Sequence, residues 1–246
     1  MAEKALLQML KESRYTTVLS GFGMLLESGY PPLRDGDESY EIEQKYGYSV
    51  EELLSSSFYS TRTEQFFDFY REEILKPLDT PPGKCFYEMA ALESAGLFQS
   101  IITRRIFGLP ERAGCKNVLN LHGSVYDNYC PHCKKTYSVD YIRDSKRVPL
   151  CENCRVPVRP RICLFGEMVD NRVITKAAEE VQKADVLLVL GTNLNTYLCT
   201  QLTGYYGGNK LIVVNPRPHF SDRYADMVIH ERVDVTLEKI RKELGE

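Results

Sequence analysis

Two closely spaced cysteine pairs near the middle of the chain restrict its fold more than any other feature. Cys130 and Cys133 form one C-x2-C pair, Cys151 and Cys154 form the other, and 17 residues lie between the pairs. Each pair turns two thiolates toward one point, and four thiolates complete the tetrahedral shell that Zn²⁺ prefers. A closed shell leaves no position for water. The pattern therefore predicts a structural zinc and indicates that any catalysis takes place elsewhere.

The composition of the 246-residue chain is that of an ordinary globular protein, with 43% hydrophobic and 26% charged residues. A net charge of -3 gives no footprint for nucleic acid. No apolar run approaches the ~20 residues needed to cross a bilayer, and residues 1–14 predict an amphipathic helix without the features of a signal peptide. The four remaining cysteines are scattered, which favours a reducing compartment, so we expect a cytoplasmic protein. They are Cys85, Cys115, Cys163 and Cys199.

Three short apolar runs predict buried parallel strands. They are Thr16–Ser20, Val186–Leu190 and Leu211–Val214. The first two lead directly into glycine, which lets a backbone approach a nucleotide phosphate closely but also occurs in plain tight turns. Helical patterns accompany the runs over Glu88–Ala95, Asn171–Lys183 and Val235–Leu244. Alternating strands and helices predict an α/β fold with a Rossmann-like, doubly wound parallel sheet, whose ligands bind at the carboxyl ends of the strands.

Two segments interrupt this alternation and predict a smaller second domain. Residues 31–78 are polar, aromatic and helix-like, with an aromatic stripe that we expect to be core packing. Residues 126–160 hold the cysteines and are too short to bury a core alone, so zinc must stabilise them. We therefore expect a nucleotide-binding large domain over 1–30, 79–125 and 161–246. The helical module (31–78) and the zinc ribbon (126–160) form the small domain.

The order of motifs along the chain resembles the sirtuin family, the NAD-dependent protein deacylases. The matching segments are Gly21–Gly23, Glu27–Arg34, Ile101–Thr103, Gly108–Leu109, Arg112–Gly114, Leu121–Ser124, the cysteine pairs, Leu164–Glu167, Gly191–Thr192 and Val213–Asn215. The resemblance covers nearly the whole chain in the same order. It implies a Rossmann-type large domain and a small domain built from a zinc ribbon and a helical module, as expected above.

The resemblance also implies roles for individual residues. His122 matches the general base that acts on the cofactor ribose, and Phe165, Gly166 and Glu167 match the edge along which an acyl-lysine peptide lies. The implied ligands are NAD, or a nucleotide resembling ADP-ribose, and an acyl-lysine protein or peptide. The implied NAD-binding residues are Gly21, Phe22, Gly23, Arg34, Arg104, Arg105, Gly191, Thr192, Asn193 and Asn215.

The chain departs from the family in the segment that holds nicotinamide. Where the family reads Thr-Gln-Asn-Ile-Asp, this chain reads Thr103–Phe107, with Arg104 and Arg105 in place of the two amides. Positive charge beside the cationic nicotinamide ring disfavours NAD⁺, whereas guanidinium groups favour phosphates or carboxylates. Phe22 replaces an alanine and can occupy ribose space. Alternatively, both arginines point outward and Phe107 fills a gap in the core.

These departures leave three functions open. The first is a divergent deacylase that transfers the acyl group to the ADP-ribose of NAD and releases nicotinamide. The second is a sensor on the same fold that binds ADP-ribose or another phosphorylated nucleotide without chemistry. The third is a protein ADP-ribosyltransferase. His122 and the segment 165–167 favour a reaction on a lysine-containing substrate, so we expect the deacylase.

Overall fold

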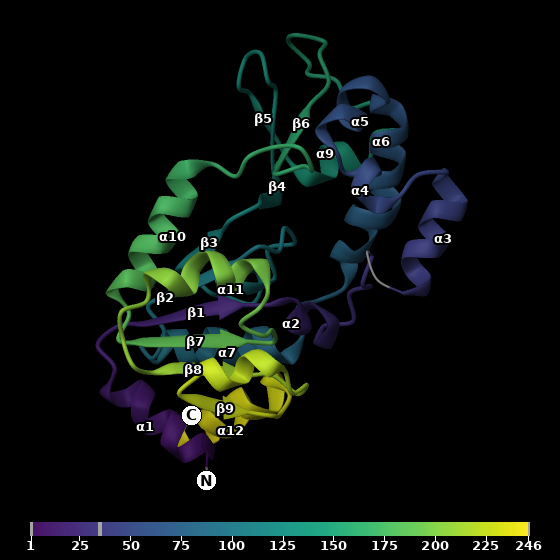
Figure 1. Ribbon diagram of the computed structural model, residues 1–246. Coiled ribbons are helices and arrows are strands. Elements are labelled where there is room, and N and C mark those ends of the chain that lie inside the picture. The colour runs from purple at the N-terminus through teal and green to yellow at the C-terminus, as the bar shows by residue number, and fades with distance from the viewer. Residues whose placement is uncertain (1, 34–35, 246) are drawn as a thin grey trace.

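The computed structural model describes residues 2–33 and 36–245, and its large domain is built on a six-stranded parallel sheet (Figure 1). The strands lie in the order β3-β2-β1-β7-β8-β9. They are β1 (Thr16–Ser20), β2 (Ser100–Thr103), β3 (Val118–Asn120), β7 (Val186–Leu190), β8 (Leu211–Val214) and β9 (Met227–Ile229). The predicted doubly wound sheet is confirmed, and β1, β7 and β8 have the predicted bounds.

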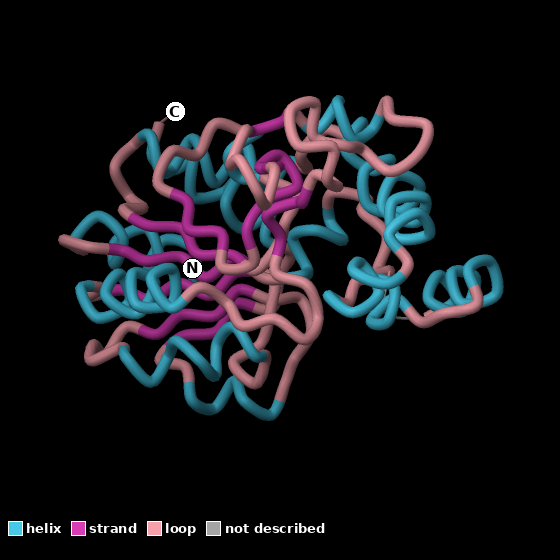
Figure 2. The backbone as a smooth tube through the Cα atoms, turned by 90° about the horizontal axis from the view of Figure 1, so that it is seen from above, coloured by secondary structure: helices cyan, strands magenta, loops and turns pink. Residues whose placement is uncertain are grey.

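Helices cover both faces of the sheet, which Figure 2 shows as a central layer of strands between helices. Successive strand residues point to opposite faces, so Leu188 belongs to one apolar cluster while Leu187 and Val189 belong to the other. The first face carries α1 (Ala2–Glu12), α7 (Lys84–Ser94) and α12 (Val233–Leu244). The second face carries α10 (Asn171–Lys183) and α11 (Tyr197–Leu202). All five strand residues of β1 and of β7 are therefore buried.

The segment between β1 and α7 is helical, as predicted. After α2 (Phe22–Glu27) it contains α3 (Asp37–Tyr46), α4 (Val50–Leu53), α5 (Ser56–Thr61), α6 (Thr63–Phe69), the π-helix η1 (Tyr70–Leu75) and the 3₁₀ helix η2 (Lys76–Asp79). The aromatic stripe is core: Phe66, Phe67, Phe69 and Tyr70 are all fully buried. Their rings pack mostly edge to face, with centroids 5.3 to 6.4 Å apart, which is the usual stable arrangement.

The cysteine-containing segment forms a second, three-stranded sheet. Its strands are β4 (Gly123–Tyr129), β5 (Thr136–Tyr137) and β6 (Arg159–Ile162), and they lie in the order β5-β4-β6. The short helix α9 (Val139–Arg143) comes between β5 and β6 in the sequence. In Figure 1 this sheet lies beside the helical module at the top of the molecule. The expected domain limits stay a prediction, since β4 and β6 both run across them.

Arg112, at the end of α8 (Leu109–Arg112), ties the large domain to the helical module. Its guanidinium group donates to the hydroxyl of Tyr30 at 2.9 Å and to the carbonyls of Leu78 and Thr80, both at 2.9 Å. These bonds fix the segment that follows the first glycine turn against the end of the module. Two short 3₁₀ helices, η3 (Thr203–Tyr205) and η4 (Phe220–Tyr224), complete the large domain. Within residues 2–33 and 36–245, no helix is long and apolar enough to cross a membrane.

Candidate functional site

The strand order reverses between β1 and β7, and the predicted glycine turns meet there. β1 and β7 are parallel neighbours, but the chain leaves β1 toward β2 and β3 and leaves β7 toward β8 and β9. The amide of Gly21 donates to Leu190 O at 2.8 Å, and the amide of Gly23 donates to Gly191 O at 2.7 Å. In open α/β sheets this reversal at the carboxyl ends of the strands is where ligands bind.

The glycines are required first by contact between the two turns. A Cβ atom on Gly21 would lie 2.3 Å from Cβ of Thr192, and one on Gly23 would lie 2.7 Å from the carbonyl oxygen of Gly191. Gly191 itself has a φ of +64°, which side chains rarely adopt. The predicted phosphate turns are thus in contact, and the sequence-based explanation of their glycines missed this packing requirement.

Two predicted nucleotide contacts, Asn193 and Asn215, lie at the same edge of the sheet. The side chain of Asn193 accepts from the amide of Asn195 at 3.0 Å, and that of Asn215 donates to Arg217 O at 3.0 Å. Both asparagines therefore order the loop in which they lie. Their role toward a nucleotide stays a prediction. The predicted contact Arg34 lies outside the described residues.

His122 lies between β3 and β4, where the large domain passes into the zinc ribbon. Its position is fixed on both sides, because the amide of Leu121 donates to Thr103 O at 2.8 Å and the amide of Cys163 donates to His122 O at 2.9 Å. The imidazole is half-buried. The Nε atom of Arg104 donates to Nε2 of His122 at 3.1 Å. A guanidinium group has no acceptor, so Nε2 carries the lone pair and the neutral ring is protonated at Nδ1.

The electrostatic environment keeps His122 neutral. Burial, together with the positive charges of Arg104 and Arg105, lowers the pKa of His122 from 6.5 to about 4. Each effect disfavours the imidazolium ion, burial by removing water and the arginines by repulsion. The ring is therefore unprotonated at neutral pH, as a general base must be, but its proton affinity is low.

The two arginines turn toward the site rather than outward. The guanidinium carbon of Arg104 lies 4.3 Å from the ring centre of Tyr197, at the start of α11, and that of Arg105 lies 5.1 Å from the ring centre of Phe22. Phe107, in contrast, is buried and packs on Tyr30 with ring centres 5.0 Å apart. The core explanation therefore holds for Phe107 and fails for the arginines.

Tyr197 is the residue at this site that sequence reasoning missed. It is 57% exposed, follows the Gly191–Thr192 turn by five residues and accepts a hydrogen bond from Gln201 at 2.7 Å. An exposed aromatic residue in a helix looks like ordinary surface. Only the position of Arg104 in three dimensions reveals its contact.

The predicted peptide edge is partly used within the protein. The amide of Phe165 donates to Leu54 O and its carbonyl accepts from the amide of Ser56, both at 2.9 Å. Glu167 accepts from Arg159 at 2.8 and 2.7 Å. Phe165 thus joins the segment to the helical module. Gly166, with φ +86°, turns the chain away after it, and the peptide-binding role of 165–167 stays a prediction.

The four predicted metal ligands come together. The Sγ atoms of Cys130, Cys133, Cys151 and Cys154 all lie within 4.8 Å of one another. The Sγ atoms of Cys133 and Cys151 are 3.7 Å apart. A tetrahedral site with Zn–S bonds of about 2.3 Å requires sulfur atoms about 3.8 Å apart, so the quartet fits zinc.

The two cysteine turns have the same backbone form. The amides of Cys133 and Cys154 donate to the first sulfur of their own pair, at 3.3 and 3.4 Å. The residues that follow, Lys134 and Arg155, both have positive φ, at 64° and 57°. The repeated geometry supports a ribbon built around one structural ion.

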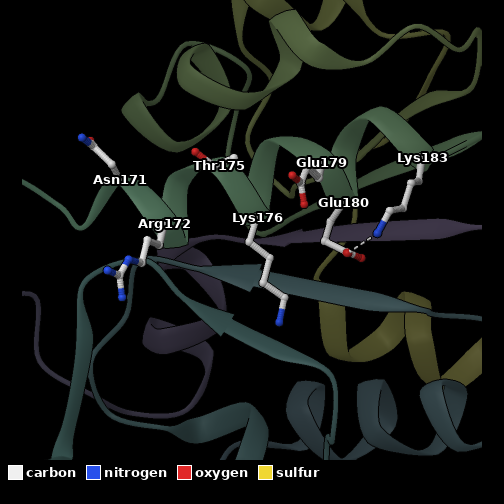
Figure 3. Close-up of a pocket in the computed structure, with 7 residues that line it drawn as sticks. All are labelled: Asn171, Arg172, Thr175, Lys176, Glu179, Glu180 and Lys183. Carbon is white, nitrogen blue, oxygen red and sulfur yellow. Dashed lines mark hydrogen bonds and ion pairs between the residues drawn. The ribbon is translucent and has the colours of Figure 1, made fainter.

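A surface hollow on α10 lies away from these residues. Figure 3 shows that all seven of its lining side chains project from this single helix, among them Lys183, which pairs with Glu180 at 2.8 Å. No residue of the glycine turns, of β2 or of the His122 segment lines the hollow. We therefore do not count it in the candidate site.

Comparison with known proteins agrees with this geometry. The sequence profile of the Sir2 family matches residues 21–197, which include both glycine turns, His122 and the cysteine quartet. An NAD-dependent protein deacetylase of Clostridium tetani is 37% identical over 243 residues, with 98% of each chain covered. Another from Thermotoga maritima is 36% identical over 220 residues, with 87% of each chain covered.

Solved structures give the same result. A structure described as "The Structural basis of Sirtuin Substrate Affinity" has a TM-score of 0.89 at 33% identity and covers 99% of both chains. One described as "Sir2-p53 peptide-NAD+" has a TM-score of 0.83 at 32% identity, with 100% of this chain and 99% of that chain covered.

Proposed function

The chain belongs to the Sir2 family, the sirtuins, and on that premise we propose that it is an NAD-dependent protein lysine deacylase with His122 as general base. The observation that carries the proposal is the position of His122. It lies in the segment that joins β3 to the zinc ribbon, with a neutral ring whose Nε2 lone pair faces Arg104, in the loop after β2. A neutral imidazole with a lone pair in the site is what proton abstraction from a ribose hydroxyl requires.

The ends of β1, β7 and β8 supply the proposed dinucleotide site. Gly21, Gly23 and Gly191 carry no side chain, so the backbone of the two close-packed turns can approach a diphosphate at these three positions. Thr192, Asn193 and Asn215 are the remaining proposed contacts at that edge. NAD, when bound, supplies the ADP-ribose that accepts the acyl group, with nicotinamide as the leaving group.

The residues of this chain have separate proposed tasks. His122 accepts the proton of a ribose hydroxyl at Nε2 as the acyl group is transferred. Phe165, Gly166 and Glu167 orient an acyl-lysine peptide. Because the amide and carbonyl of Phe165 already bond to the helical module, Phe165 fixes the position of this edge, and main-chain pairing with the peptide falls to the residues after it. Phe22 and Arg105, in contact with each other at 5.1 Å, exclude water from the nicotinamide end.

The cysteine quartet has a structural role in this proposal. Four thiolates would hold a zinc ion with no position left for water, so the ion takes part in no chemical step. It fixes β4, which begins at Gly123, directly after His122. The quartet thereby secures the base. All eight cysteines lie in the described ranges, and none of them forms a disulfide. The cytoplasmic location stays a prediction.

A second function has two features in its favour. The bond from Arg104 to His122 occupies the lone pair that catalysis needs, and Arg104 and Arg105 add positive charge where a cationic nicotinamide ring would lie. The occupied lone pair opposes catalysis, and the positive charge favours ADP-ribose over NAD⁺. A sensor that binds ADP-ribose without chemistry is therefore the alternative, ahead of a protein ADP-ribosyltransferase.

One experiment separates these functions. The purified protein is incubated with NAD⁺ and a set of acyl-lysine peptides, and nicotinamide release and acyl loss are measured beside His122→Ala. We expect peptide-dependent release that His122→Ala reduces by at least about a hundredfold, since general-base catalysis contributes 10² or more. Absence of release above His122→Ala with every acyl group, together with tighter binding of ADP-ribose than of NAD⁺ by calorimetry, would establish the sensor. Release of nicotinamide with ADP-ribose retained on the peptide would establish the transferase.

A further inference from the structure

Arg104 holds the proposed base in a state that cannot accept a proton from substrate. Its Nε–H donates to Nε2 of His122 at 3.1 Å, and the other nitrogen of the neutral ring carries a proton. The only lone pair of the imidazole is therefore engaged. A ribose hydroxyl can donate to this ring only after Arg104 has moved.

The opposite side of Arg104 is supported by an aromatic ring. The guanidinium carbon lies 4.3 Å from the ring centre of Tyr197, so the group is placed between α11 and the imidazole. Tyr197 is held in turn by Gln201, whose side-chain amide nitrogen donates to the Tyr197 hydroxyl at 2.7 Å. Arg104 thus bridges the loop after β2, the start of α11 and the base.

The groups around His122 all oppose its protonation or are neutral to it. Arg104 and Arg105 approach from the loop after β2, and both charges lower the pKa of the imidazole. From the segment after β6, Cys163 approaches with a main-chain bond, and burial raises the pKa of its thiol, so it is neutral. No carboxylate of the described residues is among the groups that shift the pKa of His122.

We propose that Arg104 is a positioning residue that latches His122 in the free protein and releases it when the diphosphate of a nucleotide binds at the glycine turns. This inference rests on the proposed function, since it assigns His122 as the base. A phosphate is a stronger partner for guanidinium than a neutral imidazole, because the bond to an anion is charge-assisted. The turns of Gly21 and Gly191 lie at the same sheet edge as the end of β2, with β1 between β2 and β7.

Release of the latch also strengthens the base. With Arg104 withdrawn, one of the two positive charges that oppose protonation is farther from the ring, and the lone pair is free for the ribose hydroxyl. The proton affinity of His122 then rises toward that of an ordinary histidine, which suits a base that works near neutral pH. Nucleotide binding and activation of the base thus become one event.

The test follows the titration of His122 by NMR of protein with labelled histidine, with His122→Asn used to assign the signal. In the free protein, Arg104→Gln, which restores the residue that sirtuins have here, is expected to raise the pKa of His122 by roughly one unit, a tenfold change in proton affinity. Arg104→Lys keeps the charge but loses the Nε donor, so the pKa of His122 in this variant is expected to lie between its values in the wild type and in Arg104→Gln. Arg161→Gln, which removes an exposed arginine paired with Asp127, is the control and leaves His122 unchanged.

ADP-ribose is the probe for release, because it cannot react. Saturating ADP-ribose is expected to raise the pKa of His122 in the wild type and to change that pKa less in Arg104→Gln. In a separate kinetic measurement, the acid limb of the pH profile of kcat/KM is expected to lie at higher pH in Arg104→Gln than in the wild type. An unchanged His122 titration in both Arg104 variants overturns the latch, and an unchanged wild-type titration with ADP-ribose overturns its release. These titrations need no turnover, so a protein that shows them but releases no nicotinamide contradicts only the proposed deacylase.

Discussion

The guanidinium carbon of Arg105 lies 5.1 Å from the centre of the Phe22 ring, so two departures from the sirtuin pattern, 83 positions apart in sequence, form one contact. Phe22 belongs to the first glycine turn and Arg105 to the loop after β2. In the proposed function, this contact is assigned to the nicotinamide end of the site. The effects of Phe22 and Arg105 on ligand binding are therefore expected to be coupled, because reverting one residue removes the contact that positions the other.

A double-mutant cycle tests this coupling. Phe22→Ala, Arg105→Asn and the double variant are compared by calorimetry with NAD⁺, and we expect a coupling free energy of about 0.5–2 kcal/mol, the range from exposed to desolvated cation–π pairs. The double variant is expected to bind NAD⁺ most tightly, because it removes both the ring and the charge. The pair Arg161 and Tyr129, with a guanidinium-to-ring distance of 4.2 Å in the zinc ribbon, is the control and is expected to show no coupling in NAD⁺ binding. Strictly additive effects of Phe22 and Arg105 would contradict the prediction.

The contact between the two glycine turns predicts a stability effect independent of any ligand. Gly21→Ala places a Cβ atom 2.3 Å from Cβ of Thr192, so the turns must separate. We expect a loss of about 1–3 kcal/mol in the free energy of unfolding, as for overpacked cores, measured by urea denaturation without nucleotide. Gly204→Ala is the matched control, because nothing lies within 4 Å of its added atom. If Gly21 is needed only for phosphate, Gly21→Ala will unfold like the wild type and lose nucleotide binding alone.

The metal centre yields a third prediction. Purified protein is expected to contain one zinc per chain by mass spectrometry, and a strong chelator is expected to lower the unfolding temperature, because the ribbon has little core of its own. Cys151→Ser removes a buried ligand and is expected to lose the metal. Cys199→Ser alters a buried cysteine on α11 outside the quartet and is expected to keep it. An unfolding temperature that chelation does not change would show that the ribbon is stable without an ion.

The parts of the fold with a strong local pattern were predictable from sequence. The strands Thr16–Ser20, Val186–Leu190 and Leu211–Val214 are continuous apolar runs because both faces of the sheet are covered, and their bounds are confirmed. The helix Asn171–Lys183 is strongly amphipathic and is also confirmed. β3, only three residues long and partly exposed, was missed because so short a segment shows no period.

The site was predictable in its parts but not in its contacts. The cysteine quartet follows from spacing alone, because two C-x2-C turns leave few other arrangements. The direction of Arg104 and the contact with Tyr197 depend on how the loop after β2 meets the start of α11, and Tyr197 comes 93 positions after Arg104 in sequence. The sequence pattern contains no signal for that approach. Only the structure decides between an outward arginine and one bonded to His122.

Glu27 supplies a fourth prediction, because it caps a helix that begins more than 200 residues later. Its carboxylate accepts from the amides of Val233 and Asp234, at 3.0 and 3.2 Å, at the start of α12. Glu27→Ala removes the acceptor for both amides, and we expect a loss of about 1–2 kcal/mol in the free energy of unfolding, as for other lost caps. Glu27→Gln keeps one acceptor oxygen and is expected to lose less. Glu41→Ala, an exposed position on α3, is the comparison by urea denaturation; equal effects of Glu27→Ala and Glu41→Ala would contradict the capping role.

The lowered pKa of His122 predicts how stability depends on pH. The pKa is about 4 in the folded protein and 6.5 in the unfolded chain, so between these values the unfolded state binds more protons. Stability therefore falls as the pH falls from about 6.5 toward 4, and this contribution is absent in His122→Asn. After allowance for partial exposure, we expect the wild type to lose on the order of 2 kcal/mol more than His122→Asn between pH 7 and pH 4.5.

Urea denaturation of both proteins at the two pH values measures this difference, and the carboxylates common to both cancel from it. The loss of unfolding free energy in Arg104→Gln is expected to lie between the losses in the wild type and in His122→Asn, because this variant removes one of the charges that oppose protonation of His122 while the burial remains. Equal acid sensitivity of the wild type and His122→Asn would mean that His122 titrates normally in the folded protein. The bond from Arg104 would then impose no electrostatic cost on His122.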